Sequence, residues 1–369
     1  MRVALLVVAL VAGSATVAHA YPRFQLATGA SSCAECHLSP TGGGLLNDYG
    51  RAEAGDTVSR GGDGTLLHGL WTPPSWLAIG GDLRGAVAAR ADDADRTVAA
   101  FPMQADLAVR AGGHGLTVNL VVGLRGSARA PRPPLVERLA SREHFLQYQR
   151  GAYYARAGRF FSPLGLRLHD HTAYVRRYLG FGLAEEPYGI GGGVVRGDWE
   201  AHLHAFVPNP VGLLGAGPKA KGVAASYERR ILDGAAAVGG GLRYAASPDD
   251  TRAELDVTGK RWFDDAGLLL LGEVALVRQG FAAVDAPRWQ LASYLGASQR
   301  LTQGVWLGLA VHRWQPDLGL RSSRDAVEID LQYFPWAHVE LHWTTRATAV
   351  GNNLDAPGLL SLAQLHYYL

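Results

Sequence analysis

The sequence predicts an all-β protein, an antiparallel transmembrane β-barrel, and three observations lead to this fold class. Segments of about ten residues with alternating apolar and polar side chains recur from Trp76 to the C-terminus. Short turn signals such as Asp233-Gly234 and Gln303-Gly304 separate them. Aromatic residues gather near the predicted strand ends, as the interfacial girdles of outer-membrane barrels require; they are Trp71, Trp76, Trp262, Trp289, Trp306, Trp336 and Tyr367. We count roughly 14 to 16 segments, consistent with a closed, even-stranded outer-membrane barrel.

The first twenty residues predict export. Arg2 precedes an apolar run over 3–12, and Ala18-His19-Ala20 matches a small-residue cleavage site. A membrane-anchoring helix would need about 20 apolar residues, and this run is shorter. We therefore expect residues 1–20 to be a signal peptide and the mature chain to begin at Tyr21.

Both cysteines of the chain lie in one short motif, Cys33-Ala34-Glu35-Cys36-His37. A redox dithiol belongs beside a strand–helix unit, and a zinc site needs four ligands, which one cysteine pair does not provide. C-x-x-C-H is the attachment motif of c-type haem, in which two thiols one helical turn apart bond the ring and the next histidine ligates the iron. We expect one covalent haem c at Cys33 and Cys36 with His37 as proximal ligand; a disulfide or a chance match is the alternative.

The segment between the motif and the first strand predicts a plug. The apolar band of such barrels is about 25 Å tall, so a haem outside it would connect only one side. We expect residues 21–70 to be a monoheme cytochrome segment with a Gly- and Pro-rich linker that folds into the barrel, and residues 71–369 to form the barrel.

The second axial ligand is not fixed by the sequence. His68 in the linker is one candidate. The alternative is that His68 is an exposed loop residue without a role in ligation. Met103 is the other, although alternation directs it outward with Leu107. A histidine of the lumen or an open coordination position also remains.

Alternation separates two faces along the predicted strands. Leu116, Val118, Leu120, Val122 and Leu124 share one face, whereas Glu200, His202 and His204, and likewise His338, Glu340 and His342, share polar faces. A soluble sandwich would bury the apolar face in a core. The scarcity of lysine, with only Lys219, Lys221 and Lys260, favours a barrel whose polar face lines a lumen.

The polar faces raise a second question, since their histidines and acids could bind a divalent metal ion or line an ion path. A polar lumen needs such residues in any case, and this is the interpretation we favour. His169 and His171 share a face by spacing, but Asp170 between them indicates a loop. Arg176-Arg177 and Glu185-Glu186 are expected to be solvated loop charges.

Composition excludes other classes. The formal charge is +2, which disfavours nucleic-acid binding. A Gly-x-Ser-x-Gly nucleophile motif is absent from the sequence, and both cysteines are assigned to the haem, so no catalytic residue is predicted.

The whole layout resembles the fused monoheme cytochrome–porins of bacterial outer membranes, best known as iron oxidases. The resemblance rests on Cys33 to His37 and on "LLNDYGR" from Leu45, which follows Pro40 after a Gly42-Gly43-Gly44 insertion. "GRFFSPLGLRL" from Gly158 is similar to a porin-type stretch, and the final strand, with Leu365, Tyr367 and Leu369 on its outward face, is similar to the C-terminal assembly signal of outer-membrane barrels.

This resemblance implies an electron carrier embedded in outer-membrane lipid. Its partners would be an extracellular reductant, ferrous iron being one candidate, and a periplasmic c-type cytochrome or another acceptor. The alternative is a small-solute porin in which the haem segment is a plug or a sensor.

Overall fold

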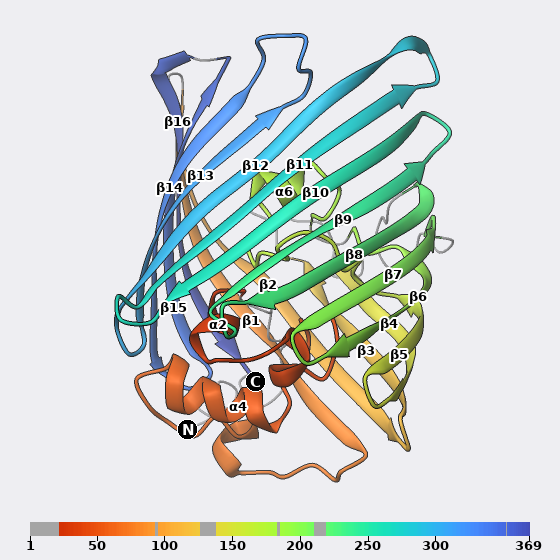
Figure 1. Ribbon diagram of the computed structural model, residues 1–369. Helices are drawn as coiled ribbons and strands as arrows, with labels where there is room; N and C mark the ends of the chain where they lie inside the picture. Colours follow the sequence, from red (N-terminus) through yellow and green to blue (C-terminus); the bar gives the residue numbers. More distant parts are fainter. Residues whose placement is uncertain (1–21, 93–94, 126–137, 183–184, 210–218, 352) are drawn as a thin grey trace.

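Sixteen antiparallel strands form one closed barrel in the computed structural model (Figure 1). It describes residues 22–92, 95–125, 138–182, 185–209, 219–351 and 353–369. Each strand pairs with its sequence neighbours, and β1 (Leu77–Ala91) pairs with β16 (Asn353–Tyr368) to close the ring. The predicted fold class is confirmed, at the upper end of the expected strand number.

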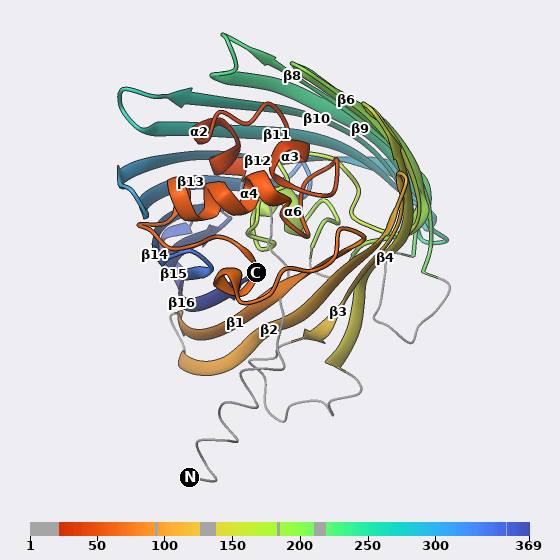
Figure 2. The ribbon, with the colours of Figure 1, turned by 90° about the horizontal axis from the view of Figure 1, so that it is seen from below.

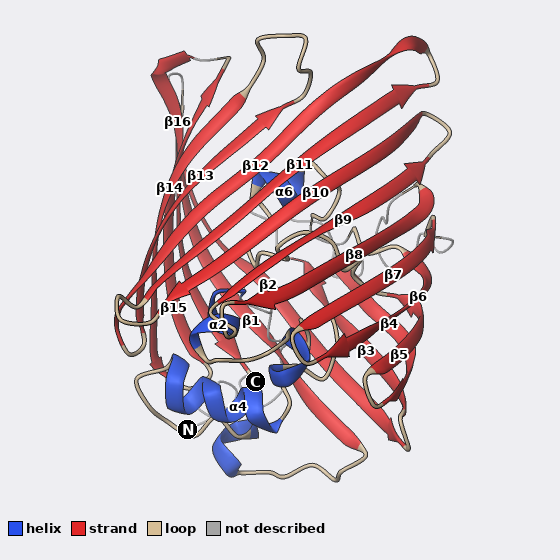
Figure 3. Ribbon diagram, viewed as in Figure 1, coloured by secondary structure: helices blue, strands red, loops and turns tan. Residues whose placement is uncertain are grey.

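The other strands follow in chain order around the wall (Figure 3). They are β2 (Arg96–Gly113), β3 (Leu116–Arg125), β4 (Leu139–Arg150), β5 (Tyr153–Arg159), β6 (Tyr188–Arg196), β7 (Trp199–Val207), β8 (Lys221–Ile231), β9 (Ala236–Ala246), β10 (Asp250–Phe263), β11 (Leu268–Phe281), β12 (Val284–Thr302), β13 (Val305–Gln315), β14 (Arg324–Trp336) and β15 (Val339–Val350).

The wall is apolar outside and polar inside, as the alternation predicts. On β10, Leu255 and Val257 are 50% and 59% exposed, whereas Glu254 and Asp256 are buried. On β7, Leu203 is exposed between the buried His202 and His204. An exposed apolar band around a closed sheet is the surface that lipid covers in outer-membrane barrels.

The two ends of the barrel differ. At the end where the described chain begins and β16 ends, turns of two to four residues join the strands, such as 114–115 and 303–304. The opposite end carries longer connections, among them 160–187 and 316–323. We call these the plug end and the loop end.

The segment 22–76 fills the mouth of the plug end, and Figure 2 shows its helices inside the ring of strands. They are α2 (Pro22–Ala27), α3 (Cys33–Cys36), α4 (Asp48–Glu53), the π-helix η1 (Ala54–Val58) and the 3-10 helix η2 (Leu66–Gly69). We call this segment the plug.

Polar bonds and aromatic contacts fix the plug to the wall. Arg23 Nη1 donates to Asp330 Oδ2 over 3.3 Å, and Lys260 Nζ donates to Gln25 Oε1 over 2.9 Å. The Phe24 ring lies 5.5 Å from Trp306, centroid to centroid. The plug is therefore packed against the inner wall of the barrel and bonded to it.

A second segment also folds inward. The connection between β5 and β6, described over residues 160–182 and 185–187 with α6 (Tyr174–Arg177), lies inside the barrel (Figure 1). Leu166 N donates to Glu273 Oε2 over 2.8 Å, and the Tyr178 ring stacks on Trp314 at 4.9 Å. We call it the inner loop.

The inner loop corrects one expectation about loop charges. Arg176 donates to the Phe181 carbonyl within the loop, and Glu186 is 2% exposed between Arg142 and Arg159. Glu186 is buried and Arg176 is only partly exposed, because the loop follows an inward path. Arg177 is exposed, as expected.

Two further expectations about side-chain direction are wrong. Met103 faces inward, since the pairing of β1 with β2 shifts between Arg84 and Gly85, and the bulge at Met103 inverts its alternation. Leu369 lies beyond β16 and is buried, with its backbone bonded to Gly81. Among the described residues, no helix is long and apolar enough to cross a membrane.

Candidate functional site

The Cys33–His37 motif forms a single helical turn held from behind. His37 N donates to the Cys33 carbonyl over 3.0 Å, and Asn47 N donates to the Cys36 carbonyl over 2.9 Å. The Asn47 side chain accepts from Gly50 N and so caps α4. The turn and α4 therefore form one unit, with both thiols on the same turn.

Gly50 permits this close approach. A Cβ atom at this position would lie 2.2 Å from the Cys36 carbonyl oxygen. The three glycines of the insertion have a related role. Gly42, Gly43 and Gly44 all have positive φ, between 63° and 76°, which lets the chain reverse so that Leu38 N bonds the Leu45 carbonyl.

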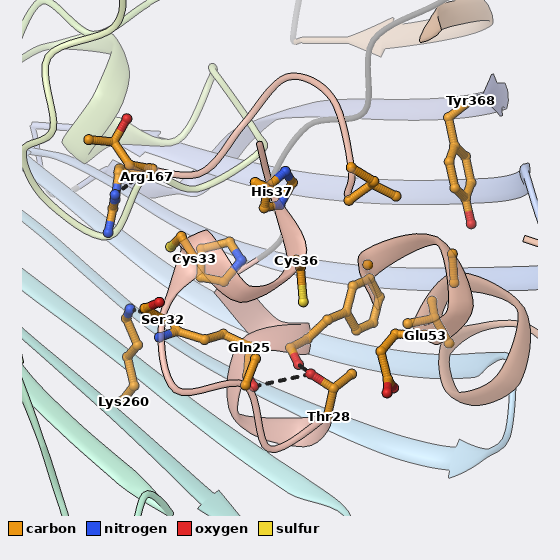
Figure 4. A pocket seen from close by; sticks show the side chains of 18 of the residues that line it. Gln25, Thr28, Ser32, Cys33, Cys36, His37, Glu53, Arg167, Lys260 and Tyr368 are labelled. Carbon is orange, nitrogen blue, oxygen red and sulfur yellow. Dashed lines mark hydrogen bonds between the residues drawn. The ribbon is translucent and has the colours of Figure 1, made fainter. Parts of the chain in front are cut away.

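A cavity of about 890 Å³ opens in front of the motif, enclosed by the plug, the inner loop and the barrel wall (Figure 4). Cys33, Cys36 and His37 line it together. The remaining lining residues are Pro22, Phe24, Gln25, Thr28, Ala30, Ser32, Thr41, Leu46, Gly50, Glu53, Ala54 and Val58 from the plug, Leu166 and Arg167 from the inner loop, and Lys260, Phe334, His366 and Tyr368 from the wall. We call it the motif cavity.

Burial sets the protonation of the motif. Burial lowers the pKa of His37 to about 4, which leaves the imidazole neutral at pH 7 with a lone pair for a metal. Burial also raises the pKa of the Cys33 thiol, and that of the Cys36 thiol to about 12. Neither sulfur is in a disulfide, so both are free to bond.

Two cations on one side of the motif cavity are already paired. Arg167 Nη2 lies 2.9 Å from Glu200 Oε1, and Lys260 Nζ lies 2.7 Å from Glu228 Oε2. Arg167 adopts φ of 55°, and its side chain also donates to the Thr41 carbonyl of the plug. This side of the motif cavity is polar and nearly neutral in charge.

The two distal ligand candidates lie elsewhere. His68 is exposed on η2, and its Nδ1 donates to the Asp63 carbonyl over 3.0 Å. Its ring lies 4.9 Å from that of His338. Met103 lines a separate lumen cavity of about 900 Å³, together with Arg84, Asp330 and His342. The structure brings neither side chain to the motif cavity.

The structure instead brings two residues of β16 to the motif cavity, His366 and Tyr368. Sequence reasoning missed both, because the last strand meets the plug only once the barrel closes. Alternation along the last strand was the signal that could have found them, because both lie on the face opposite to that of the lipid-facing Leu365.

The other histidines of the predicted lumen face are confirmed as buried. His202, His204, His338 and His342 are each less than 7% exposed, and His169 and His171 lie in the inner loop. Burial lowers the pKa of His171 to about 4. Within the described part of the chain, no group of three or more His, Cys, Asp or Glu side chains is arranged to hold a metal ion.

The motif cavity fits a haem c by three criteria. Cys33, Cys36 and His37 line the cavity together, so both thiols and the imidazole reach one space. Phe24, Leu46, Val58, Leu166 and Phe334 give it the apolar surface that such a ring buries. Burial keeps the His37 imidazole neutral, which is the form that ligates a metal.

Comparison with known proteins identifies the fold of this chain only. No protein-family profile matches the chain, and no curated protein matches it. Solved structures do match. Outer-membrane expressed OmpT of Vibrio cholerae gives a TM-score of 0.59 at 10% identity, covering 81% of this chain and 99% of that chain.

Two channel proteins also match. The outer membrane channel DcaP of Acinetobacter baumannii gives a TM-score of 0.59 at 12% identity, over 81% of this chain and 99% of that one. The anion-selective porin from Comamonas acidovorans gives 0.55 at 10% identity, over 79% and 100%. This chain therefore has the fold of a porin-type outer-membrane barrel.

Proposed function

We propose that this protein is an outer-membrane electron carrier that holds one covalent c-type haem inside a porin-type barrel. The observation that carries the proposal is the motif cavity. The only two cysteines of the chain and His37 open together onto one largely apolar cavity. A chance C-x-x-C-H would not be expected to come with such a space.

Each residue of the motif has a defined role in this proposal. Cys33 and Cys36 would bond the ring, and His37 would ligate the iron through its neutral imidazole. The bound haem supplies reversible one-electron chemistry. The plug, the inner loop and the wall line the site, while Asn47 and Gly50 hold the motif turn in place.

The direction of the barrel suggests the partners. Short turns face the periplasm in outer-membrane barrels, and the plug lies at the end with short turns. The motif cavity would then be close to a periplasmic acceptor such as a c-type cytochrome. The reductant would approach from the loop end, and ferrous iron is the candidate that the cytochrome–porin resemblance indicates.

The alternative function is that of a small-solute porin, with the haem segment as a plug or a sensor. The porin-type neighbours favour this alternative. The bonds from Arg23, Gln25 and Arg60 to the wall count against it, because a solute path would have to pass a firmly attached plug.

An optical titration of the purified full-length protein tests the haem. We expect a covalent c-type spectrum that persists after denaturation and is lost in Cys33→Ala/Cys36→Ala, with Ser31→Ala beside the motif as the matched control. Prompt reduction by ferrous iron at fixed pH would support iron as donor. Reduction by dithionite alone would point to another donor, and an absence of covalent haem would overturn the proposal.

Conductance in planar bilayers separates the two functions. The carrier should conduct weakly while the plug is in place, and deletion of residues 22–76 should raise the conductance. Large, stable conductance by the intact haem-loaded protein would favour the porin instead.

A further inference from the structure

Three buried titratable side chains meet where the barrel closes, and the function proposed above does not use them. His366 of β16 lies between Asp82 of β1 and Glu340 of β15. His366 Nδ1 is 2.7 Å from Glu340 Oε2, and Nε2 is in hydrogen-bond contact with Asp82 Oδ1. All three side chains are at most 2% exposed. We call them the seam triad.

The seam triad must hold at least one dissociable proton. A neutral imidazole carries one N–H, so it can donate to one carboxylate only. Both ring nitrogens of His366 face carboxylate oxygens, so a second proton must sit on the ring or on a carboxyl group. Because the three groups interact closely, that proton belongs to the set and not to one residue.

The seam triad also faces the proposed redox site. His366 lines the motif cavity together with Cys33, Cys36 and His37. In a buried, poorly screened interior, a charge added in the cavity changes the proton affinity of a neighbouring group much more than it would in water. By linkage, the protonation state of the group changes the affinity of the cavity for an electron to the same degree.

Other charged and titratable groups of the described residues also lie around His366. The guanidinium of Arg84 on β1 lies close to two members of the seam triad. Its Nη2 is 3.5 Å from His366 Nε2, and its Nε is 3.5 Å from Asp82 Oδ1. The Tyr368 ring lies 5.2 Å from the imidazole. Across the motif cavity are Glu53 of the plug and the paired cations Arg167 and Lys260. With both carboxylates ionised and His366 protonated, Arg84 brings the local charge to zero.

Polar groups lead from the seam triad toward the lumen. Glu340 Oε1 is 3.9 Å from His342 Nδ1, and His342 Nε2 is 3.7 Å from Asp330 Oδ2. His342 and Asp330 line the lumen cavity of about 900 Å³. This chain of closely spaced titratable side chains gives a proton a route from the lumen to the seam triad.

We infer that the seam triad takes up a proton from the lumen when an electron enters the motif cavity and releases it when the electron leaves. One electron and up to one proton are gained together, so the interior keeps its charge. The electron comes from the reductant of the proposed carrier and the proton from lumen water. This inference rests on the proposed function and gives it a second, proton-carrying part.

The test is the reduction potential of the haem-loaded, full-length protein, measured by optical titration from pH 5 to 9. We expect the wild-type potential to fall as pH rises, by up to about 59 mV for each tenfold drop in proton concentration in a one-electron couple. His366→Gln should lose most of this slope. The matched control is His204→Gln, since His204 is equally buried but does not line the motif cavity.

The outcomes separate the inference from the function. A potential that does not change with pH in the wild type, or an equal slope in His366→Gln and wild type, overturns the inference and leaves the carrier intact. An absence of haem overturns both. If His366→Gln fails to fold, Asp82→Asn replaces it, because its side chain keeps the shape while removing the charge.

Discussion

At the scale of single residues, His37 carries the largest consequence. Its imidazole is neutral because it is buried, and this suits an iron ligand. The same burial makes the haem-free plug sensitive to acid. The unfolded chain binds a proton at His37 near the ordinary pKa of 6.5, whereas the folded plug resists protonation down to a pKa of about 4.

We therefore predict that the haem-free plug loses stability as pH falls from about 6.5 to 4. Between these values the unfolded state binds more protons, so its free energy falls relative to the folded state. The shift corresponds to about 3 kcal/mol at 1.36 kcal/mol per pKa unit.

The urea concentration that exposes Cys36 to a disulfide reagent, compared at pH 7 and pH 4.5, measures this change. His37→Asn should remove most of the difference between the two pH values. An equal difference in the variant would show that other groups cause it.

At the scale of elements, the motif turn and α4 act as one unit because a glycine lets them touch. This contact gives a structural role to two residues of the "LLNDYGR" stretch that resembles the cytochrome–porins. Asn47 caps α4 and bonds the motif backbone, and Gly50 gives the space.

Gly50→Ala should lower covalent haem incorporation. The new methyl group would lie 2.2 Å from the Cys36 carbonyl oxygen, so α4 must move, at a cost of about 1–3 kcal/mol. The ratio of haem to protein after purification measures this. Gly259→Ala on β10 is the control, because its Cβ would meet nothing within 4 Å. Normal incorporation in Gly50→Ala would contradict the tight contact.

The attachment of α2 to the wall gives a second prediction at this scale. Arg23→Met leaves Asp330 buried beside His342 without its guanidinium, and breaking such a pair costs about 3–5 kcal/mol. Arg23→Met/Asp330→Leu should recover much of that loss. Protease sensitivity of the plug reports it.

The control for this pair is Arg288→Met. Its partner Asp317 lies 3.8 Å away, and the arginine side chain is 51% exposed, so its loss should cost less than about 1 kcal/mol. A double variant as unstable as Arg23→Met would show that the ion pair is not what anchors α2.

At the scale of the whole molecule, the sequence predicted what depends on local pattern. Alternation gave the strands and their faces, so Leu203 and Leu255 are outside and His202 and Glu254 inside. The spacing of Cys33, Cys36 and His37 predicts a haem site, which stays a prediction, and a cavity lies in front of this motif. These features depend on residues close together in the chain.

Side-chain positions that depend on closure of the barrel or on a β-bulge could not be predicted from the sequence. His366 reaches the motif cavity only through the pairing of the first and last strands. The inner loop turns inward through contacts with β7 and β11, so its local composition indicated a solvated loop. Met103 faces the lumen because of a bulge, which alternation alone cannot reveal.

The residues that line the motif cavity are synthesised at different times. The motif is made first, while Phe334, His366 and Tyr368, which complete the enclosure, belong to the last strands to be made. A closed barrel leaves no side entrance for a large planar ring or for the enzymes that would attach it. For the proposed carrier, haem attachment should therefore precede the closing of the wall, while the N-terminal segment is still accessible in the periplasm. A chain truncated before His366 should carry covalent haem, detectable by its peroxidase activity in a denaturing gel, without forming a barrel. A truncated chain without haem would place attachment after assembly instead.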